Sequence, residues 1–317
     1  NHCKAFLKSW LISLIVLFGS CIHVIAQQIK VPAQYPTIQA AIEASEDFDT
    51  ILIHEGRYYE NINFMGKAIT VASYFILDGD TSHMSRTIID GSKPVHPDTA
   101  STVLMISGED SSSVLCGLTI TGGAGTRASI FGPWDRVGGG ILVYNGGASI
   151  DHNIIEGNVL NHNQGTYVHG GGIYACLYGD TYRHFICTNN LIRRNTINSN
   201  RAAQGGGLAV AKYSGSVLIQ NNTVVANRIT STNTFRAVHG GGVSIRTQVP
   251  VIGSLVVREN IISGNELWGG KRPFRTDPQG PEYRPLSGAG IIVVLFEAIG
   301  YQIDLNPYPL ICDNIIR

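Results

Sequence analysis

The chain repeats one pattern four times: a glycine triplet, and then two asparagines that are five residues apart. The triplets begin at residues 138, 170, 205 and 240, so that successive copies are 32, 35 and 35 residues apart. A fifth copy begins with Ser287-Gly288-Ala289-Gly290-Ile291. A period of this length is typical of proteins in which one supersecondary unit stacks on the next. The pattern therefore predicts a solenoid.

Each repeat contains short runs of β-branched residues separated by glycine or asparagine, too short for helices and too regular for loops. One run follows the glycines, a second precedes the first asparagine, as in Val217-Leu218-Ile219, and a third follows it, as in Thr223-Val224-Val225. In the glycine-led run one set of side chains points inward and the alternate set outward. Three strands per turn predict an all-β fold, a three-sheet parallel β-helix.

Stacked coils lie about 4.8 Å apart, which places equivalent residues of successive repeats on top of one another. An asparagine amide can donate to and accept from its neighbours above and below, so a column of amides satisfies a buried bend. Such a ladder is predicted for Asn153, Asn190, Asn222, Asn260 and Asn314. The glycine triplets are interpreted as bends that need unusual dihedral angles or a close backbone approach. Cys187 stands where other repeats have isoleucine or valine, which predicts a core position.

Charge and cysteine spacing exclude several functions. The 317 residues include 23 basic and 23 acidic side chains and are 15% charged, so no field attracts nucleic acid or an anionic membrane. With 44% hydrophobic residues, one packed domain is expected. The six cysteines have no metal-binding spacing, and we expect neither a metal nor a cofactor.

Residues 1–26 have the pattern of an export signal peptide: Lys4 and Lys8, an apolar run, and then small or branched residues. A lipoprotein signal at Cys21 and a transmembrane anchor are the alternatives. Removal of the signal leaves residues 27–317 as the β-helix domain, with no membrane span. The sequence stops inside a repeat, so we expect a C-terminal truncation. We expect a monomer that is secreted or lies at the cell surface.

A solenoid must cover its open ends, because exposed strand edges pair with other chains. Residues 36–45 place Ile38, Ala41 and Ile42 on one face of a short helix, ahead of a strand at residues 50–54. This helix is predicted to cap the N-terminal end of the solenoid.

Several motifs near the start of the mature chain form a recognisable series. They are Val31-Pro32-Ala33-Gln34-Tyr35-Pro36-Thr37-Ile38-Gln39-Ala40-Ala41-Ile42, Asp49-Thr50-Ile51-Leu52-Ile53, Gly56-Arg57-Tyr58-Tyr59-Glu60-Asn61-Ile62 and Thr87-Ile88-Ile89-Asp90-Gly91. Together with the glycine and asparagine repeats, this series resembles secreted bacterial right-handed parallel β-helix repeat proteins of the pectin lyase-like superfamily. The resemblance implies a right-handed helix and an extracellular polysaccharide or glycan as partner, although a fold alone supplies no activity.

In proteins of that kind, the binding surface is usually the outer face of the glycine-led sheet. The outward set here is Leu142, Tyr144, Tyr174, Cys176, Ala209, Ala211, Ser244, Arg246, Ile292 and Val294. It contains none of the carboxylates that a hydrolase or a calcium-assisted lyase needs. Tyr144 and Tyr174 are candidates for a sugar-binding platform, or else simply cover the sheet. Arg246, with Lys212 one coil below, is a candidate for neutralising a uronate carboxylate, or an ordinary solvated basic pair.

The segments between the third strand and the next glycine triplet are expected to be long loops along one edge. They cover residues 124–136, 159–168, 197–204, 229–238 and 266–286, and are rich in aromatic and arginine residues. Their candidate sugar-binding residues are Trp134, Arg136, Trp268 and Arg272, with packing against the sheet as the alternative.

Two pairs of residues at equivalent positions of different repeats are interpreted as structural. His169 and His239 share one position and are expected about 10 Å apart, too far to share a metal. Glu156 and Arg193 are predicted to form a surface ion pair on adjacent coils.

Three functions remain open from the sequence. The first is a secreted or surface protein that binds carbohydrate without a catalytic constellation. The second is a polysaccharide lyase that acts on uronate polymers by β-elimination, with Arg246 or a loop lysine or arginine as the neutralising group and Lys271, His239 or Tyr283 as the base. The third is a passive surface scaffold or adhesin domain.

Overall fold

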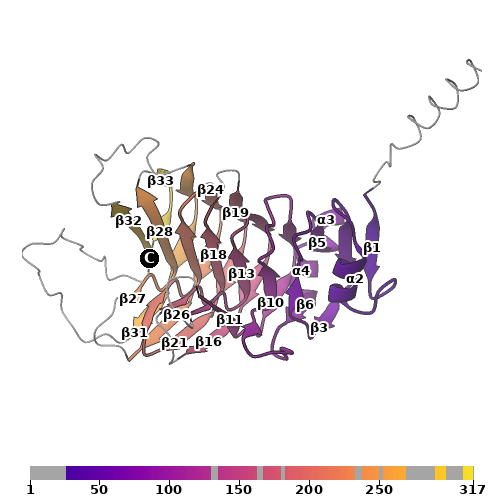
Figure 1. The fold of residues 1–317 in the computed structure, drawn as a ribbon, viewed down its shortest axis with the longest axis horizontal. Coiled ribbons are helices and arrows are strands. Elements are labelled where there is room, and N and C mark those ends of the chain that lie inside the picture. Colours follow the sequence, from indigo (N-terminus) through magenta and orange to yellow (C-terminus); the bar gives the residue numbers. More distant parts are fainter. Residues whose placement is uncertain are drawn as a thin grey trace, which may run out of the picture.

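A computed structural model describes residues 26–129, 135–162, 167–179, 183–232, 238–249, 253–268, 290–297 and 310–316. The chain winds along one axis as a parallel β-helix, so that sequence position advances from one end of the molecule to the other (Figure 1). This confirms the predicted all-β, right-handed solenoid. No helix among these residues is long and apolar enough to cross a membrane.

Three parallel sheets wrap around the main core, as predicted. Sheet A contains β1 (Gln28–Val31), β2 (Thr50–Ile53), β5 (Thr70–Ser73), β9 (Val114–Cys116), β14 (Ala148–Asp151), β19 (His184–Thr188), β24 (Ser216–Gln220), β29 (Leu255–Arg258) and β33 (Leu310–Cys312). Sheet B contains β3 (Gly56–Tyr58), β6 (Thr87–Asp90), β10 (Thr119–Thr121), β15 (Ile154–Glu156), β20 (Leu191–Arg193), β25 (Thr223–Val225), β30 (Ile261–Ser263) and β34 (Ile315–Ile316). Sheet C, which holds the glycine-led strands, contains β4 (Ile62–Asn63), β8 (Val103–Met105), β13 (Ile141–Tyr144), β18 (Ile173–Leu177), β23 (Leu208–Lys212), β28 (Val243–Val249) and β32 (Ile291–Glu297).

Equivalent apolar residues of successive coils form columns inside the three sheets. One column from each sheet meets in the core: Ile141, Ile173, Leu208 and Val243 from sheet C; Ile150, Cys187, Ile219 and Val257 from sheet A; and Ile155, Ile192, Val224 and Ile262 from sheet B. Each of these residues is buried, and Cys187 occupies its predicted core position. Each buried side chain of this size stabilises the fold by roughly 1.5–3 kcal/mol before entropy is counted.

The predicted asparagine ladder is present at the bend between sheets A and B. The side-chain oxygen of Asn222 accepts from both the backbone N–H and the amide of Asn190, each at 3.0 Å. Asn222 in turn donates its backbone N–H and its amide to the oxygen of Asn260 at 2.9 and 3.0 Å. Asn153 and Asn314 continue the same pattern at the two ends.

A second ladder, which the sequence analysis did not identify, runs through the second asparagine of each repeat. Asn158, Asn195, Asn227 and Asn265 are all buried. The amides of the first three donate to the side-chain oxygen of the next, each at 2.9 Å. Two amide columns therefore hold the same coils together at two bends.

The glycine triplets lie at the bend that leads into sheet C, and both predicted reasons for glycine apply. The first glycine of each triplet has a positive φ between 60° and 68°, which favours glycine. The second has no room for a side chain, because a Cβ on Gly171 would collide with the carbonyl oxygen of Gly206 in the next coil. Gly171 and Gly206 also face Ile197 and Ile229, respectively.

The segments predicted to be long loops contain two additional sheets, which corrects that prediction. Sheet D contains β7 (Thr99–Ala100), β11 (Gly125–Ala128), β12 (Asp135–Val137), β17 (Tyr167–His169), β22 (Ala202–Gln204) and β27 (Val238–His239). Sheet E contains β16 (Val159–His162), β21 (Thr196–Ser199), β26 (Arg228–Ser231) and β31 (Glu266–Trp268). Leu160, Ile197 and Ile229 of sheet E pack against Val168 and Ala203 of sheet D in a separate small core. That core holds these segments as strands, so the middle coils have five strands instead of three.

The N-terminal end is capped by a helix, as predicted. Helix α2 (Ile38–Ala44) buries Ile38, Ala41 and Ile42 against the main core. Its first N–H groups donate to both carboxylate oxygens of Glu60, at 3.0 and 2.9 Å. Its last carbonyls accept from the ammonium of Lys67 at 2.6–2.8 Å. The charges match the helix dipole at each end. One difference is that β1 precedes the helix and pairs with β2.

We expect the Asn222→Ala variant to lose about 3 kcal/mol of unfolding free energy, because it removes the acceptor of the buried backbone N–H of Asn190 and the amide that donates to Asn260. Chemical denaturation measures the loss. Asn198→Ala is the matched control, since its amide is exposed and bonds only to the exposed side chain of Asn161. Equal effects of the two substitutions would contradict the ladder's role in stability.

Candidate functional site

The outer face of sheet C is more enclosed than the sequence analysis predicted. Tyr174 is only 1% exposed, and Leu142, Cys176, Ala209 and Ala211 are also buried. These residues form a second apolar cluster that includes Val137 of β12 and contacts Ala128 of β11. The neighbouring sheet D therefore covers part of this face. Tyr174 is part of a packed layer and does not offer the exposed platform that its outward position suggested.

Three rings form a stack that joins sheet D to sheet C. His169 lies between Tyr167 and Tyr174, with ring centroids 5.6 and 5.5 Å away and nearly parallel planes. Burial, together with the positive charge of Arg246, lowers the pKa of His169 to about 3. The imidazole is therefore neutral at ordinary pH. Burial likewise raises the pKa of Tyr174 well above its usual value.

Arg246 lies on the outer face of sheet C, half-buried, in register with Ala211 of β23. Its charge acts on two different rings, since it lowers the pKa of His169 and partly offsets the effect of burial on Tyr213. Burial nevertheless raises the pKa of Tyr213 to about 12.

Three tyrosines lie near the carboxyl ends of successive strands on this face, and Tyr144 stands in the same row as Arg246, three coils away. Tyr144 ends β13, Tyr178 follows β18 and Tyr213 follows β23. Tyr178 is 62% exposed and packs edge-on against Tyr213 at 5.8 Å. Tyr144 and Tyr213 are partly buried against the apolar cluster. We call Tyr144, Tyr178, Tyr213 and Arg246 the tyrosine–arginine cluster.

Lys212 does not join Arg246, contrary to the predicted basic pair. It pairs in register with Leu177 and Thr247, in the set that alternates with the outward residues. Lys212 is 1% exposed, and burial lowers its pKa to about 8. The side chains of Arg246 and Lys212 point to opposite faces of sheet C. A single carboxylate therefore cannot contact both of them.

The remaining candidate residues lie apart from the cluster or outside the described chain. Arg136 is half-buried and donates to the backbone carbonyls of Pro97, Ala124 and Gly125 at 3.0–3.2 Å, which is a structural role. His239 is half-buried in β27, aligned with Gln204 and then His169 as expected. Trp268 is 56% exposed on sheet E. Trp134, Lys271, Arg272 and Tyr283 lie outside the described residues.

Tyr178 and Tyr213 were not predicted from the sequence, although a signal was present. Three consecutive repeats place a tyrosine one to two residues before a glycine, at the end of the glycine-led strand: Tyr144-Asn145-Gly146, Tyr178-Gly179 and Tyr213-Ser214-Gly215.

Glu156 and Arg193 do form their predicted ion pair, at 2.6 Å.

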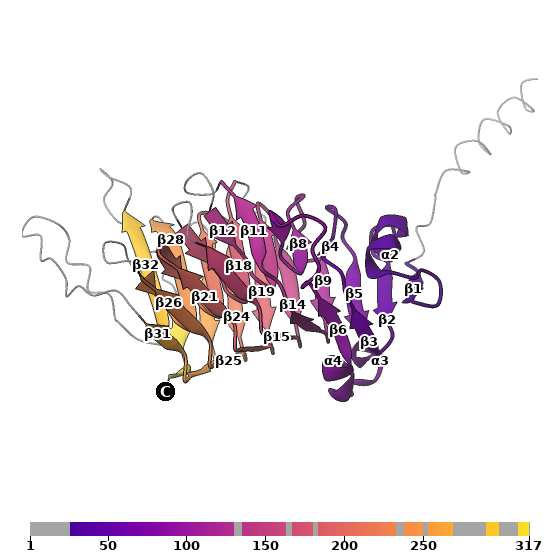
Figure 2. The same cartoon turned by 90° about the horizontal axis from the view of Figure 1, so that it is seen from below.

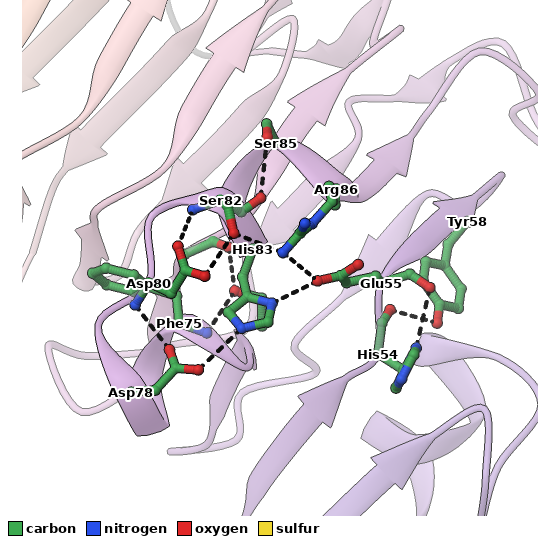
Figure 3. A network of polar contacts seen from close by, with 12 residues as sticks. His54, Glu55, Tyr58, Phe75, Asp78, Asp80, Ser82, His83, Ser85 and Arg86 are labelled. Carbon is green, nitrogen blue, oxygen red and sulfur yellow. Dashed lines mark hydrogen bonds and ion pairs between the residues drawn. The ribbon is translucent and has the colours of Figure 1, made fainter.

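A separate polar network surrounds His83 near the N-terminal end (Figure 3). His83 belongs to α4 (Ser82–Arg86), which follows the short helix α3 (Phe75–Asp78). Its Nδ1 lies 2.8 Å from the carboxylate of Glu55 and its Nε2 lies 3.1 Å from that of Asp78. Arg86 reaches the same Glu55 oxygen at 2.9 Å.

Both ring nitrogens of His83 face carboxylates, which suits an imidazolium that donates on two sides. Burial lowers the pKa of His83, but the hydrogen bonds and charges of Asp78 and Glu55 outweigh it and raise the pKa above 6.5. With both nitrogens engaged, the ring holds the two short helices against the turn after β2. The network is a structural clamp. Among the described residues, no group of three or more potential ligands could hold a metal ion.

No protein-family model matches this chain, and no curated protein matches it. The fold and the side-chain geometry therefore supply the basis for a functional assignment.

The His83 clamp predicts a pH dependence with a definite sign. Because the folded pKa is raised, the clamp's contribution is fully present below pH 6.5 and is lost as the pH rises through the folded value. Hydrogen exchange should show protection of residues 75–86 that falls over this range. In the His83→Gln variant, the protection of residues 75–86 should be lower than in wild type and should not change with pH over this range. An identical pH profile in both proteins would contradict the clamp.

Proposed function

We propose that the protein is a secreted or surface-exposed β-helix protein that binds a polysaccharide through the tyrosine–arginine cluster, without cleaving it. The observation that supports this proposal most strongly is the exposed ring of Tyr178, which packs against Tyr213. Tyr178 lies on the same face of sheet C as Tyr144 and Arg246. A phenol ring combines an apolar face with a hydroxyl group, and a guanidinium offers five donors to sugar oxygens. Such anchors on a rigid scaffold are typical of binding sites.

The location and family are part of the same proposal. The lysine-led apolar segment over residues 1–26 supports export. The motifs at residues 31–91 and the repeat itself support a relationship to the pectin lyase-like superfamily. Extracellular polysaccharide is the partner class that both features favour.

Binding suits this cluster better than β-elimination does. A lyase needs a base that accepts a proton at working pH, and catalytic pKa values lie near that pH. Here the pKa of His169 is about 3 and that of Tyr213 about 12, so the first is a weak base and the second stays protonated. The outward residues of β13, β18, β23 and β28 include no carboxylate.

Substitution of the exposed tyrosine tests the binding site. A glycan array with the mature chain identifies ligands, and calorimetry then measures affinity. We expect Tyr178→Ala to weaken binding about tenfold, the loss typical of an interface anchor. Tyr59→Ala is the matched control, because Tyr59 is 49% exposed but lies at the N-terminal end of the solenoid. Equal affinities for wild type and Tyr178→Ala would overturn the assigned site, and absence of any glycan ligand would favour a passive scaffold.

The lyase alternative has a direct assay. The mature chain is incubated with pectate, alginate and glycosaminoglycans, with and without calcium, while the ultraviolet absorbance of unsaturated products is followed. We expect no product from any polymer. Product formation that Arg246→Ala abolishes would replace the binding proposal with the lyase.

A further inference from the structure

Sheet E presents a second surface, distinct from the outer face of sheet C. It runs along the lower edge of the solenoid in Figure 1 and is seen from below in Figure 2. One of its faces packs on sheet D through Leu160, Ile197 and Ile229. The residues that alternate with these point away from that small core. They are Val159, Asn161, Thr196, Asn198, Arg228, Thr230, Glu266 and Trp268.

Four of these residues form a straight row across the strands. Asn161 pairs in register with Asn198, Asn198 with Thr230, and Thr230 with Trp268. Neighbours in such a row are about 4.8 Å apart. Asn161, Asn198 and Trp268 are exposed, and the Asn198 amide donates to the Asn161 oxygen at 2.9 Å. We call Asn161, Asn198, Thr230 and Trp268 the amide row.

The indole at the end of the row is held in place while its surface stays open. Its Nε1 donates to the carboxylate of Glu266 at 2.8 Å. The guanidinium of Arg228 lies 5.2 Å from the ring centroid and 3.6 Å from the same carboxylate. Trp268 is nevertheless 56% exposed. A ring oriented before the ligand arrives loses little conformational freedom on binding.

The charges of this face select the kind of ligand. Its charged residues, within the described strands of sheet E, are Arg228 and Glu266, and they face each other. The face is therefore neutral overall and complementary to an uncharged chain. Amides and hydroxyls in a row provide donors and acceptors for successive sugar hydroxyls, and an indole provides a flat surface for a pyranose ring.

We propose that the amide row is a second carbohydrate-binding surface, and that it takes an uncharged, extended glycan chain. One pyranose unit stacks on Trp268 while the following units lie along Thr230, Asn198 and Asn161. The inference shares the ligand class of the proposed function but uses different residues on a different sheet, so the two surfaces can be tested separately.

The experiment is calorimetry on the mature full chain with the uncharged hexasaccharides of cellulose, mannan and xylan, beside hexagalacturonate as the charged probe. We expect at least one uncharged probe to bind. Trp268→Ala should weaken that binding tenfold or more, and Asn198→Ala severalfold, while Trp268→Phe should keep most of it. The exposed control Tyr59→Ala should leave it unchanged. Unfolding midpoints of all variants should match wild type, since each substituted side chain is exposed.

The outcomes separate the two proposals. Failure of every uncharged probe to bind, or unchanged binding in Trp268→Ala, overturns the amide row whatever happens at the tyrosine–arginine cluster. Loss of uncharged-probe binding in Trp268→Ala alone supports the amide row, even if Tyr178→Ala has no effect on any glycan and the proposed site on sheet C is rejected.

Discussion

The structure depends on amide hydrogen bonds that run from coil to coil. After the first member of each ladder, every buried asparagine accepts two hydrogen bonds from the preceding coil and satisfies a bend that water cannot reach. Because a slip of one residue would move every side chain to the opposite face, this vertical pairing also fixes the register of the strands. The core columns, the glycine bends and the rows of outward side chains all follow from that register.

The same register explains where variation can accumulate. Inside the three enclosing sheets, the repeat has to supply small apolar residues, asparagine or glycine at set positions, so those positions have little freedom for recognition. Outward positions are free of that demand. The tyrosine–arginine cluster and the amide row are both outward sets, and in both the regular spacing of the coils places unlike residues side by side. A regular scaffold thus produces ordered surfaces.

Much of the scaffold could be predicted from the sequence, because the repeat reports directly on stacking. The solenoid, the ladder through Asn222, the core position of Cys187 and the capping helix were all predicted. The strands of sheets D and E were not, although Leu160, Ile197 and Ile229 alternate with polar residues. The alternation of side chains along the strand identified Tyr174 as an outward residue, but it could not show that sheet D covers this side chain. The site was accordingly predicted only in part: Tyr144 and Arg246 belong to the cluster, whereas its most exposed ring, Tyr178, was missed.

The central claim is that the repeat builds the scaffold and that outward aromatic residues recognise glycan. A crystal structure of residues 27–317 with an oligosaccharide chosen by binding tests this most directly. The account predicts sugar density against the ring of Tyr178 or of Trp268, with the asparagine ladders unchanged. Density at any other surface, with both rings uncovered, would contradict it.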